Sequence, residues 1–153
     1  MINRHGTIAN ILAEKDIKRR KLLKKIEELT NQRVVSYVAN PNMTPNFIDH
    51  NDPIFFNDLL ENIKSVKKLN LILDSPGGEP NIAEKIALMC REHCEEFRVI
   101  VPHTAKSAAT LIALASDEIL LGYLSELGPI DPQIRVVAPT GRITFIPAQS
   151  VID

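Results

Sequence analysis

The ten residues from Leu69 to Gly78 read LNLILDSPGG, and they predict both a buried element of the fold and a sharp turn. The apolar part is continuous rather than alternating, which is typical of a strand that is buried on both faces in a parallel sheet. Pro76, Gly77 and Gly78 then end the strand, and apolar positions at helical spacing follow. The stretch therefore predicts a strand, a turn and a helix in succession.

Segments of similar character lie on both sides of this stretch. Strands are predicted at RVVSYVAN (residues 33–40), FRVIVP (residues 97–102) and EILLG (residues 118–122). A helix is predicted from Asp52 to about Val66, because Asp caps helices and the following Pro suits the first helical position. The alternation of strand and helix predicts an α/β fold of repeated βαβ units with a mainly parallel sheet. RVVAPTGRITF, near the end of the chain, predicts a hairpin.

The first thirty residues are set apart by their charge. Apolar positions at mostly helical spacing predict a helix over residues 8–29, and seven basic residues fall between Lys15 and Lys25. We expect residues 1–30 to form a basic amphipathic helix and residues 31–153 to form the main domain. The helix packs either on a domain or a sister subunit, or on an anionic membrane surface as a peripheral contact.

Composition narrows the class of protein. The chain has 153 residues, 44% of them hydrophobic and 24% charged, with a net charge of −1. This balance is that of a globular protein and gives no electrostatic reason to expect a nucleic-acid partner. No apolar run approaches the roughly 20 residues that cross a bilayer, and the N-terminus lacks the apolar core of a signal peptide. A cytoplasmic location, with membrane association as the alternative, is expected.

The two cysteines, Cys90 and Cys94, are four residues apart in a helical pattern. This spacing predicts that both lie on one face of a helix. No second Cys or His pair completes a zinc site, so we expect two buried or half-buried thiols in a reducing compartment. No metal and no organic cofactor is expected.

VPHTAKSAAT, residues 101–110, places a serine between a predicted strand and a predicted helix. Ser107 has two interpretations, a helix cap or a nucleophile near the positive end of the helix dipole. In a parallel sheet the loops that follow the carboxyl ends of the strands line one edge. Ser107 and the Gly77–Gly78 turn are therefore expected at the same edge, which would supply the nucleophile and the oxyanion site that acyl transfer needs.

Three motifs occur in the order LILDSPGGEPNIAEKIA, VPHTAKSAATLIALASDEI and LGPIDPQ. With them the chain resembles the serine dehydrogenase proteinase family over roughly residues 33–153. That family is grouped with the Clp-protease and signal peptide peptidase A serine peptidases. The resemblance implies a crotonase-like fold of stacked ββα units, a serine peptidase acting on proteins or peptides, and a homo-oligomer that shelters the site.

Carried over residue by residue, the resemblance makes Ser107 the nucleophile. It makes Gly77 and Gly78 the backbone of the oxyanion hole, with the amide of Ala108 contributing. Asp131 matches an aspartate that is typical of the family and receives no role.

The general base is not evident, because residues 108–153 contain neither His nor Lys. The local candidates are His103, four residues before the serine, and Lys106, directly before it. A base could also come from a further C-terminal portion or from a neighbouring subunit. Two other functions stay open: a catalytically inactive oligomeric scaffold of the same fold, and an acyl-CoA enzyme of the crotonase type. The second is disfavoured because enolate chemistry needs no serine nucleophile.

Overall fold

The computed structural model describes residues 4–39, 46–63, 65–130, 133–137 and 140–147. Its elements in chain order are α1 (Arg4–Thr30), β1 (Arg33–Val38), α2 (Asp52–Ile63), β2 (Val66–Asp74), α3 (Pro80–Glu92), β3 (Cys94–Val101), β4 (Thr104–Ala105), α4 (Ala108–Leu114), β5 (Glu118–Leu121), β6 (Glu126–Leu127), β7 (Gln133–Val137) and β8 (Ile143–Pro147).

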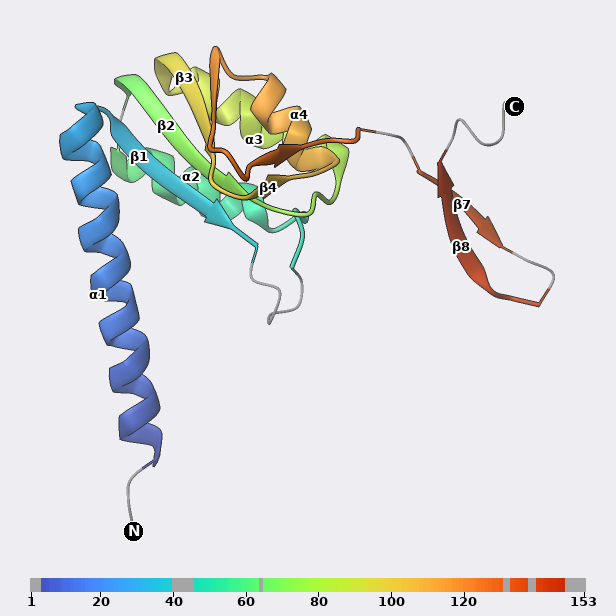
Figure 1. The fold of residues 1–153 in the computed structure, drawn as a ribbon, viewed down its shortest axis with the longest axis horizontal. Coiled ribbons are helices and arrows are strands. Elements are labelled where there is room, and N and C mark those ends of the chain that lie inside the picture. The colour runs from blue at the N-terminus through green and yellow to red at the C-terminus, as the bar shows by residue number, and fades with distance from the viewer. Residues whose placement is uncertain (1–3, 40–45, 64, 131–132, 138–139, 148–153) are drawn as a thin grey trace.

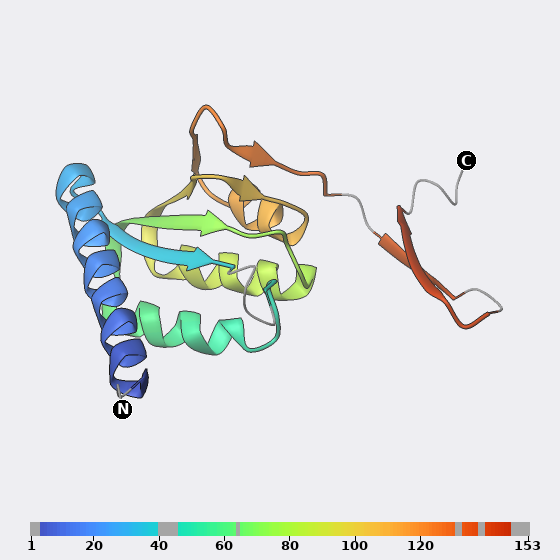
Figure 2. The same cartoon turned by 60° about the horizontal axis from the view of Figure 1, so that its bottom comes forward.

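The main sheet has the strand order β1-β2-β3-β5, and each neighbouring pair is parallel. This confirms the predicted α/β fold with a mainly parallel sheet. Helices α2 and α3 lie together under one face of this sheet (Figure 2). The strands β4 and β6 form a separate short parallel pair, and β7 and β8 form the predicted hairpin, which stands apart from the sheet in both views (Figures 1 and 2).

The hydrophobic core lies between the sheet and the helices beneath it. Alternate residues of the two central strands face the helices and are fully buried, among them Leu71 of β2 and Val99 of β3. They pack with buried side chains of the helices, such as Leu60 of α2 and Ile86 of α3. Burial of a large aliphatic side chain contributes about 1.5–3 kcal/mol, so the core fixes the carboxyl ends of β2 and β3 in place.

The starts of two strands differ from the prediction. The helix α2 ends at Ile63 rather than near Val66, and β2 already begins at Val66. The extra residues form the ladder through the pairs Val66–Cys94 and Lys68–Glu96, and the second of these is also an ion pair. Exposed charged residues extend the strands there, so the apolar pattern of the sequence could not reveal their true starts.

The prediction that Cys90 and Cys94 share a helix face is wrong. Helix α3 ends at Glu92, and Cys94 is the first residue of β3. The Cys94 thiol donates a hydrogen bond to the carbonyl oxygen of Cys90, at 3.2 Å. Both thiols are free, with Cys90 buried and Cys94 half-buried, as expected.

The N-terminal helix α1 is longer than predicted, and its last turns contact β1. Glu27 accepts a hydrogen bond from the backbone N–H of Val34, at 3.1 Å. The apolar side chains of Ile17, Leu22 and Leu29 remain exposed. Within the described residues, no other part of the chain covers these three apolar side chains. No described helix is long and apolar enough to cross a membrane.

Candidate active site

Two loops meet at the carboxyl edge of the sheet, as their positions after β2 and β3 require. The backbone N–H of Ser75 donates to the carbonyl oxygen of Thr104, at 2.9 Å. The backbone N–H of Lys106 donates in turn to the carbonyl oxygen of Ser75, at 3.0 Å. These two bonds form a short parallel bridge between Ser75 and Ala105, which joins the paired-glycine turn to the serine turn.

Ser107 adopts a strained backbone conformation at the N-terminal end of α4. Its φ is 50° and its ψ is −120°, a region that residues with a Cβ seldom occupy. Such strain costs about 1–3 kcal/mol and persists where the surrounding structure enforces it. The Ser107 side chain makes no capping hydrogen bond to the helix, so capping does not explain this conformation. A sharp strand-to-helix turn of this kind instead exposes a serine hydroxyl at the edge of a sheet.

Gly77 and Gly78 take φ values of 111° and 146°, which only glycine adopts without strain. A Cβ atom on Gly77 would lie 2.8 Å from the Cβ of Ser107 and 3.3 Å from the amide nitrogen of Ala108. A Cβ on Gly78 would overlap the backbone of Ile48. The two glycines are thus required both by their own conformation and by the closeness of the neighbouring backbone.

The backbone N–H groups around the serine fall into two sets. The N–H of Ser107 donates to the carbonyl oxygen of Pro129, at 3.0 Å. Those of Gly78 and Ala108 have no hydrogen-bond acceptor among the residues that the structure describes. Gly77 lies next to both, so these two N–H groups are close to each other at the serine turn.

Two buried hydroxyl groups hold this arrangement, and sequence reasoning missed both. The Ser75 hydroxyl accepts from the N–H of Gly77, at 3.1 Å, and so fixes the glycine turn. The Thr110 hydroxyl donates to the carbonyl oxygen of Ala105, at 2.6 Å, and accepts from the N–H of Gly128, at 2.9 Å. Thr110 therefore ties the Leu-Gly-Pro segment to the serine turn. A hydroxyl residue in the first turn of an otherwise apolar helix was the only signal for it.

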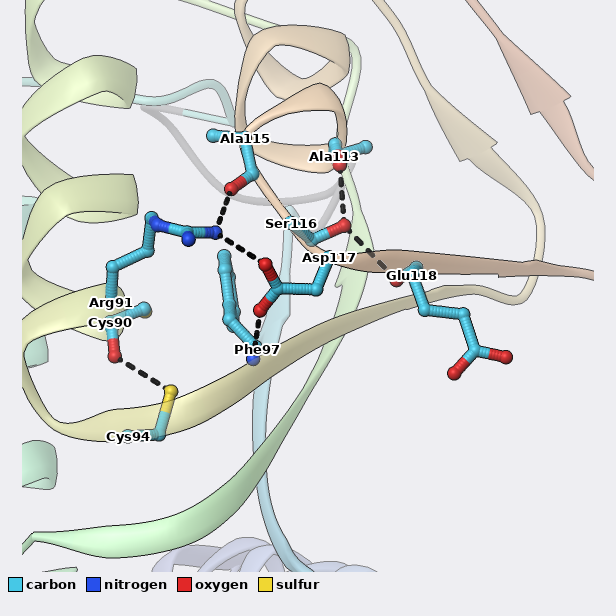
Figure 3. A network of polar contacts seen from close by, with 9 residues as sticks. All are labelled: Cys90, Arg91, Cys94, Phe97, Ala113, Ala115, Ser116, Asp117 and Glu118. Carbon is cyan, nitrogen blue, oxygen red and sulfur yellow. Dashed lines mark hydrogen bonds and ion pairs between the residues drawn. The ribbon is translucent and has the colours of Figure 1, made fainter.

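The far end of α4 is anchored by a polar network (Figure 3). Arg91 of α3 donates to the carbonyl oxygen of Ala115, at 2.8 Å, and to the carboxylate of Asp117, at 3.1 Å. Asp117 also accepts from the backbone N–H of Phe97, at 2.8 Å. Hydrogen bonding from Phe97 and then Arg91 lowers the pKa of Asp117. Both ends of the short helix that carries Ser107 are thereby held.

The two candidate bases lie in different surroundings. Lys106 donates to the carboxylate of Glu126, at 2.6 Å, and this bond and charge lower the pKa of Glu126. The side chain of His103 is 73% exposed, and its Nδ1 lies 3.7 Å from Asp74. Among the described residues no hydrogen bond reaches the hydroxyl of Ser107. Asp131, the residue matched by resemblance, lies outside the described residues.

A cavity of about 890 Å³ opens at the same edge of the sheet. Its lining includes Tyr37 of β1 and Phe56 of α2, whose rings stack, and it reaches Asp74 and His103 beside the serine turn. Burial and a hydrogen bond to Asp52 raise the pKa of Tyr37. In the described part of the chain, no group of three or more His, Cys, Asp or Glu residues is placed to hold a metal ion.

The fold and the serine turn define a class, in which a parallel α/β sheet carries a strained serine beside a paired-glycine turn. The chain belongs to the family of ClpP-like SDH-type serine proteinases, whose model matches residues 8–147. The resemblance read from the three motifs is thereby confirmed at the level of the family, which is one of serine peptidases.

Two uncharacterized proteins of Methanocaldococcus jannaschii share part of this sequence. MJ1495 is 47% identical over 66 residues, which cover 43% of this chain and 23% of that protein. MJ0137 is 48% identical over 68 residues, which cover 44% of this chain and 24% of that protein. The matching segment thus spans about a quarter of these relatives.

Two solved structures show the same fold at low sequence identity. A mutant of the membrane-bound stomatin-specific protease 1510-N superposes with a TM-score of 0.57 and 18% identity, covering 78% of this chain and 56% of that chain. ClpP1 from Listeria monocytogenes superposes with a TM-score of 0.50 and 17% identity, covering 83% of this chain and 68% of that one. At these identities the likeness concerns the fold.

Proposed function

We propose that the chain is the catalytic domain of a serine peptidase in which Ser107 attacks the carbonyl carbon of a peptide bond. The observation that carries this proposal is the strained backbone of Ser107. Its side chain makes no capping hydrogen bond to the helix that would account for the strain. Backbone strain of this kind gathers at functional sites because it orients a reacting group. The amides of Gly78 and Ala108 would then donate to the oxyanion of the tetrahedral intermediate.

The reaction has the two steps of acyl transfer. The hydroxyl oxygen of Ser107 forms a bond to the carbonyl carbon, its proton passes to a base, and the amine leaves with that proton. Water then attacks the acyl-enzyme and releases the carboxylate. Oxyanion donors fixed before the substrate arrives contribute about 3–4 kcal/mol each to such reactions.

His103 is the local candidate to test first as the base. The Lys106 side chain is engaged by its hydrogen bond to the carboxylate of Glu126, so it is not directed at the serine hydroxyl. His103 lies beside Asp74, and a carboxylate near an imidazole orients the ring. We expect His103→Gln to lower peptide hydrolysis by about 100-fold or more, and Lys106→Met to change it only a few-fold. The reverse order would assign the base to Lys106, and equal small effects would place it outside these two residues.

The experiment that tests the nucleophile is labelling with a fluorophosphonate, together with hydrolysis of β-casein. Wild-type protein should be labelled once, at Ser107, and Ser107→Ala should be neither labelled nor active. Ser116→Ala is the matched control, because Ser116 lies at the other end of α4 and bonds the carbonyl oxygen of Ala113. Labelling that survives Ser107→Ala would exclude Ser107 as the nucleophile.

A catalytically inactive scaffold is the second candidate function. It is favoured by one observation: within the described residues, nothing hydrogen-bonds the Ser107 hydroxyl. This function predicts neither labelling nor hydrolysis in the wild type, and unchanged assembly in Ser107→Ala. We also propose that the chain forms a homo-oligomer, in keeping with the exposed apolar side chains of α1. Sedimentation of the protein at several concentrations tests this part independently of catalysis.

A further inference from the structure

Strand β1 forms one edge of the main sheet, and no described strand pairs with its outer side. Its backbone groups alternate in direction. The N–H of Ala39 points to β2 and donates to Asp74, at 2.8 Å, whereas the N–H of Val34 points outward and donates to Glu27 of α1. Ser36 and Val38 share the alternation of Val34, so their N–H and C=O groups also face outward. An edge of this kind is a template for pairing with another chain.

The cavity of about 890 Å³ runs along this edge of β1. Residues 36–39 line it, with Phe55 and Leu59 of α2 on one side and Arg19 of α1 on the other. Figure 2 shows the same arrangement, with β1 above α2 and beside α1. Phe55 is 63% exposed and Leu59 44% exposed, so both offer apolar surface beside the backbone edge. The edge is therefore bordered on both sides, and none of the described strands covers it.

The same cavity extends to the loops that precede Gly77 and Ser107. Its lining continues from β1 to Pro76 and Thr104 at the carboxyl edge of the sheet. Pro76 directly precedes Gly77, and Thr104 accepts the hydrogen bond that joins the two loops. A chain that lay along β1 would thus reach the two loops that carry Gly77 and Ser107.

We propose that the outer edge of β1 from Ser36 to Val38 docks an extended, unstructured polypeptide, which adds to the sheet as a further strand and leads toward Ser107. That the docked chain is led toward Ser107 for cleavage rests on the proposed peptidase function. The docking itself does not rest on it. Only an extended polypeptide backbone offers donors and acceptors at the repeat that Ser36 and Val38 present. Side chains at alternate positions of the added strand would cover Phe55 and Leu59. The edge of β1 therefore selects segments with apolar residues at every second position.

Binding of fluorescein-labelled β-casein, an unstructured polypeptide, to the Ser107→Ala protein tests the docking without hydrolysis. Ser36→Pro removes an outward N–H, and proline is tolerated on an edge strand at such a position. Ser36→Ala keeps the N–H and is the matched control. We expect Ser36→Pro to weaken binding by about tenfold or more, and Ser36→Ala to weaken it by less than about twofold. No binding in the parent protein, or equal binding by the two variants, would overturn the proposal.

Hydrogen exchange gives a second measurement that needs no substitution on the edge, and it decides the matter if Ser36→Pro does not fold. The amides of Ser36 and Val38 should exchange fast in the free protein and slowly with β-casein bound. Those of Val35 and Tyr37 should be slow in both states, because they bond to β2. Unchanged exchange at Ser36 and Val38 on adding β-casein overturns the proposal. The proposal is also overturned if these two amides are protected in the free protein and their protection increases with protein concentration. A second copy of the chain then occupies the edge.

The fluorophosphonate experiment separates the two proposals. If the wild type is not labelled but the Ser107→Ala protein binds β-casein along β1, the docking proposal stands and the peptidase proposal is overturned. If the wild type is labelled but the Ser36→Pro and Ser36→Ala variants bind β-casein equally, the peptidase proposal stands and the docking proposal is overturned.

Discussion

Gly77 and Ser107 face each other so closely that a Cβ atom on Gly77 would lie 2.8 Å from the Cβ of Ser107. The same atom would lie 2.7 Å from the carbonyl oxygen of Lys106. Real side chains do not approach their neighbours so closely, so the serine turn is shaped around a position that has no side chain. The close approach of the two loops thus depends on the absence of a side chain at Gly77.

The strain at Ser107 predicts an inverted order of stability for two substitutions. Ser107→Gly should have a larger free energy of unfolding than Ser107→Ala, by about 1 kcal/mol, because glycine removes strain of about 1–3 kcal/mol and adds less in unfolded-state entropy. Chemical denaturation measures the difference. At Ser116, whose φ is not positive, glycine should be the less stable of the pair. If alanine is the more stable residue at both positions, Ser107 is not strained.

Gly78 should tolerate no side chain. Gly78→Ala forces a Cβ into the backbone of Ile48 at a φ of +146°, so we expect a loss of about 3 kcal/mol or failure to fold. Gly141→Ala is the matched control, because Gly141 has a φ of +78° and open space around it. We expect that change to cost about 1 kcal/mol. Thermal unfolding of the two variants should separate them, and equal losses would contradict the clash.

The arrangement of the loops was predictable from the sequence to a considerable extent. The continuous apolar run before Pro76 predicts a buried parallel strand, and parallel strands bring the following loops to one edge. From that, the meeting of the glycine turn with Ser107 follows. The strain at Ser107 does not, because serine is also a favoured cap and a sequence contains no dihedral angles.

Other features could not be predicted because they depend on partners that are distant in the chain. Thr110 reads as one more residue of an apolar helix, and its two hydrogen bonds to the flanking loops exist only in the folded protein. The early start of β3 has the same origin. Cys94 joins the sheet because Val66 lies opposite it, against the helical spacing of the two cysteines.

The network at the far end of α4 predicts a dependence of stability on pH. The folded protein lowers the pKa of Asp117 below its ordinary value of 3.8. The carboxylate therefore stabilises the fold above that ordinary value, and this contribution is lost as the pH falls through the lower, folded value. The thermal midpoint of Asp117→Asn should fall less steeply than that of the wild type between about pH 5 and pH 2. Asp58→Asn, at an exposed position of α2, should follow the wild type, and parallel curves for all three proteins would contradict the role of Asp117.

The two thiols should differ in reactivity. Burial raises the pKa of Cys90 to about 12, with the nearby Cys94 adding to the shift, and Cys90 is fully buried. Burial also raises the pKa of Cys94, which remains partly accessible. With iodoacetamide at about pH 8, mass spectrometry should find Cys94 modified first and Cys90 modified only as fast as the protein unfolds. In Cys94→Ser protein the same slow rate should persist at Cys90. Fast modification of Cys90 in native buffer would show that the helix opens locally.

The bridge between Ser75 and Ala105 has a consequence for protein engineering. The two hydrogen bonds of this bridge join main-chain atoms, so they do not depend on the side chains that line the neighbouring cavity. Phe55 and Leu59 can therefore be varied in a library without moving the turn itself. A designer could alter what the cavity accepts while leaving the geometry at Ser107 untouched.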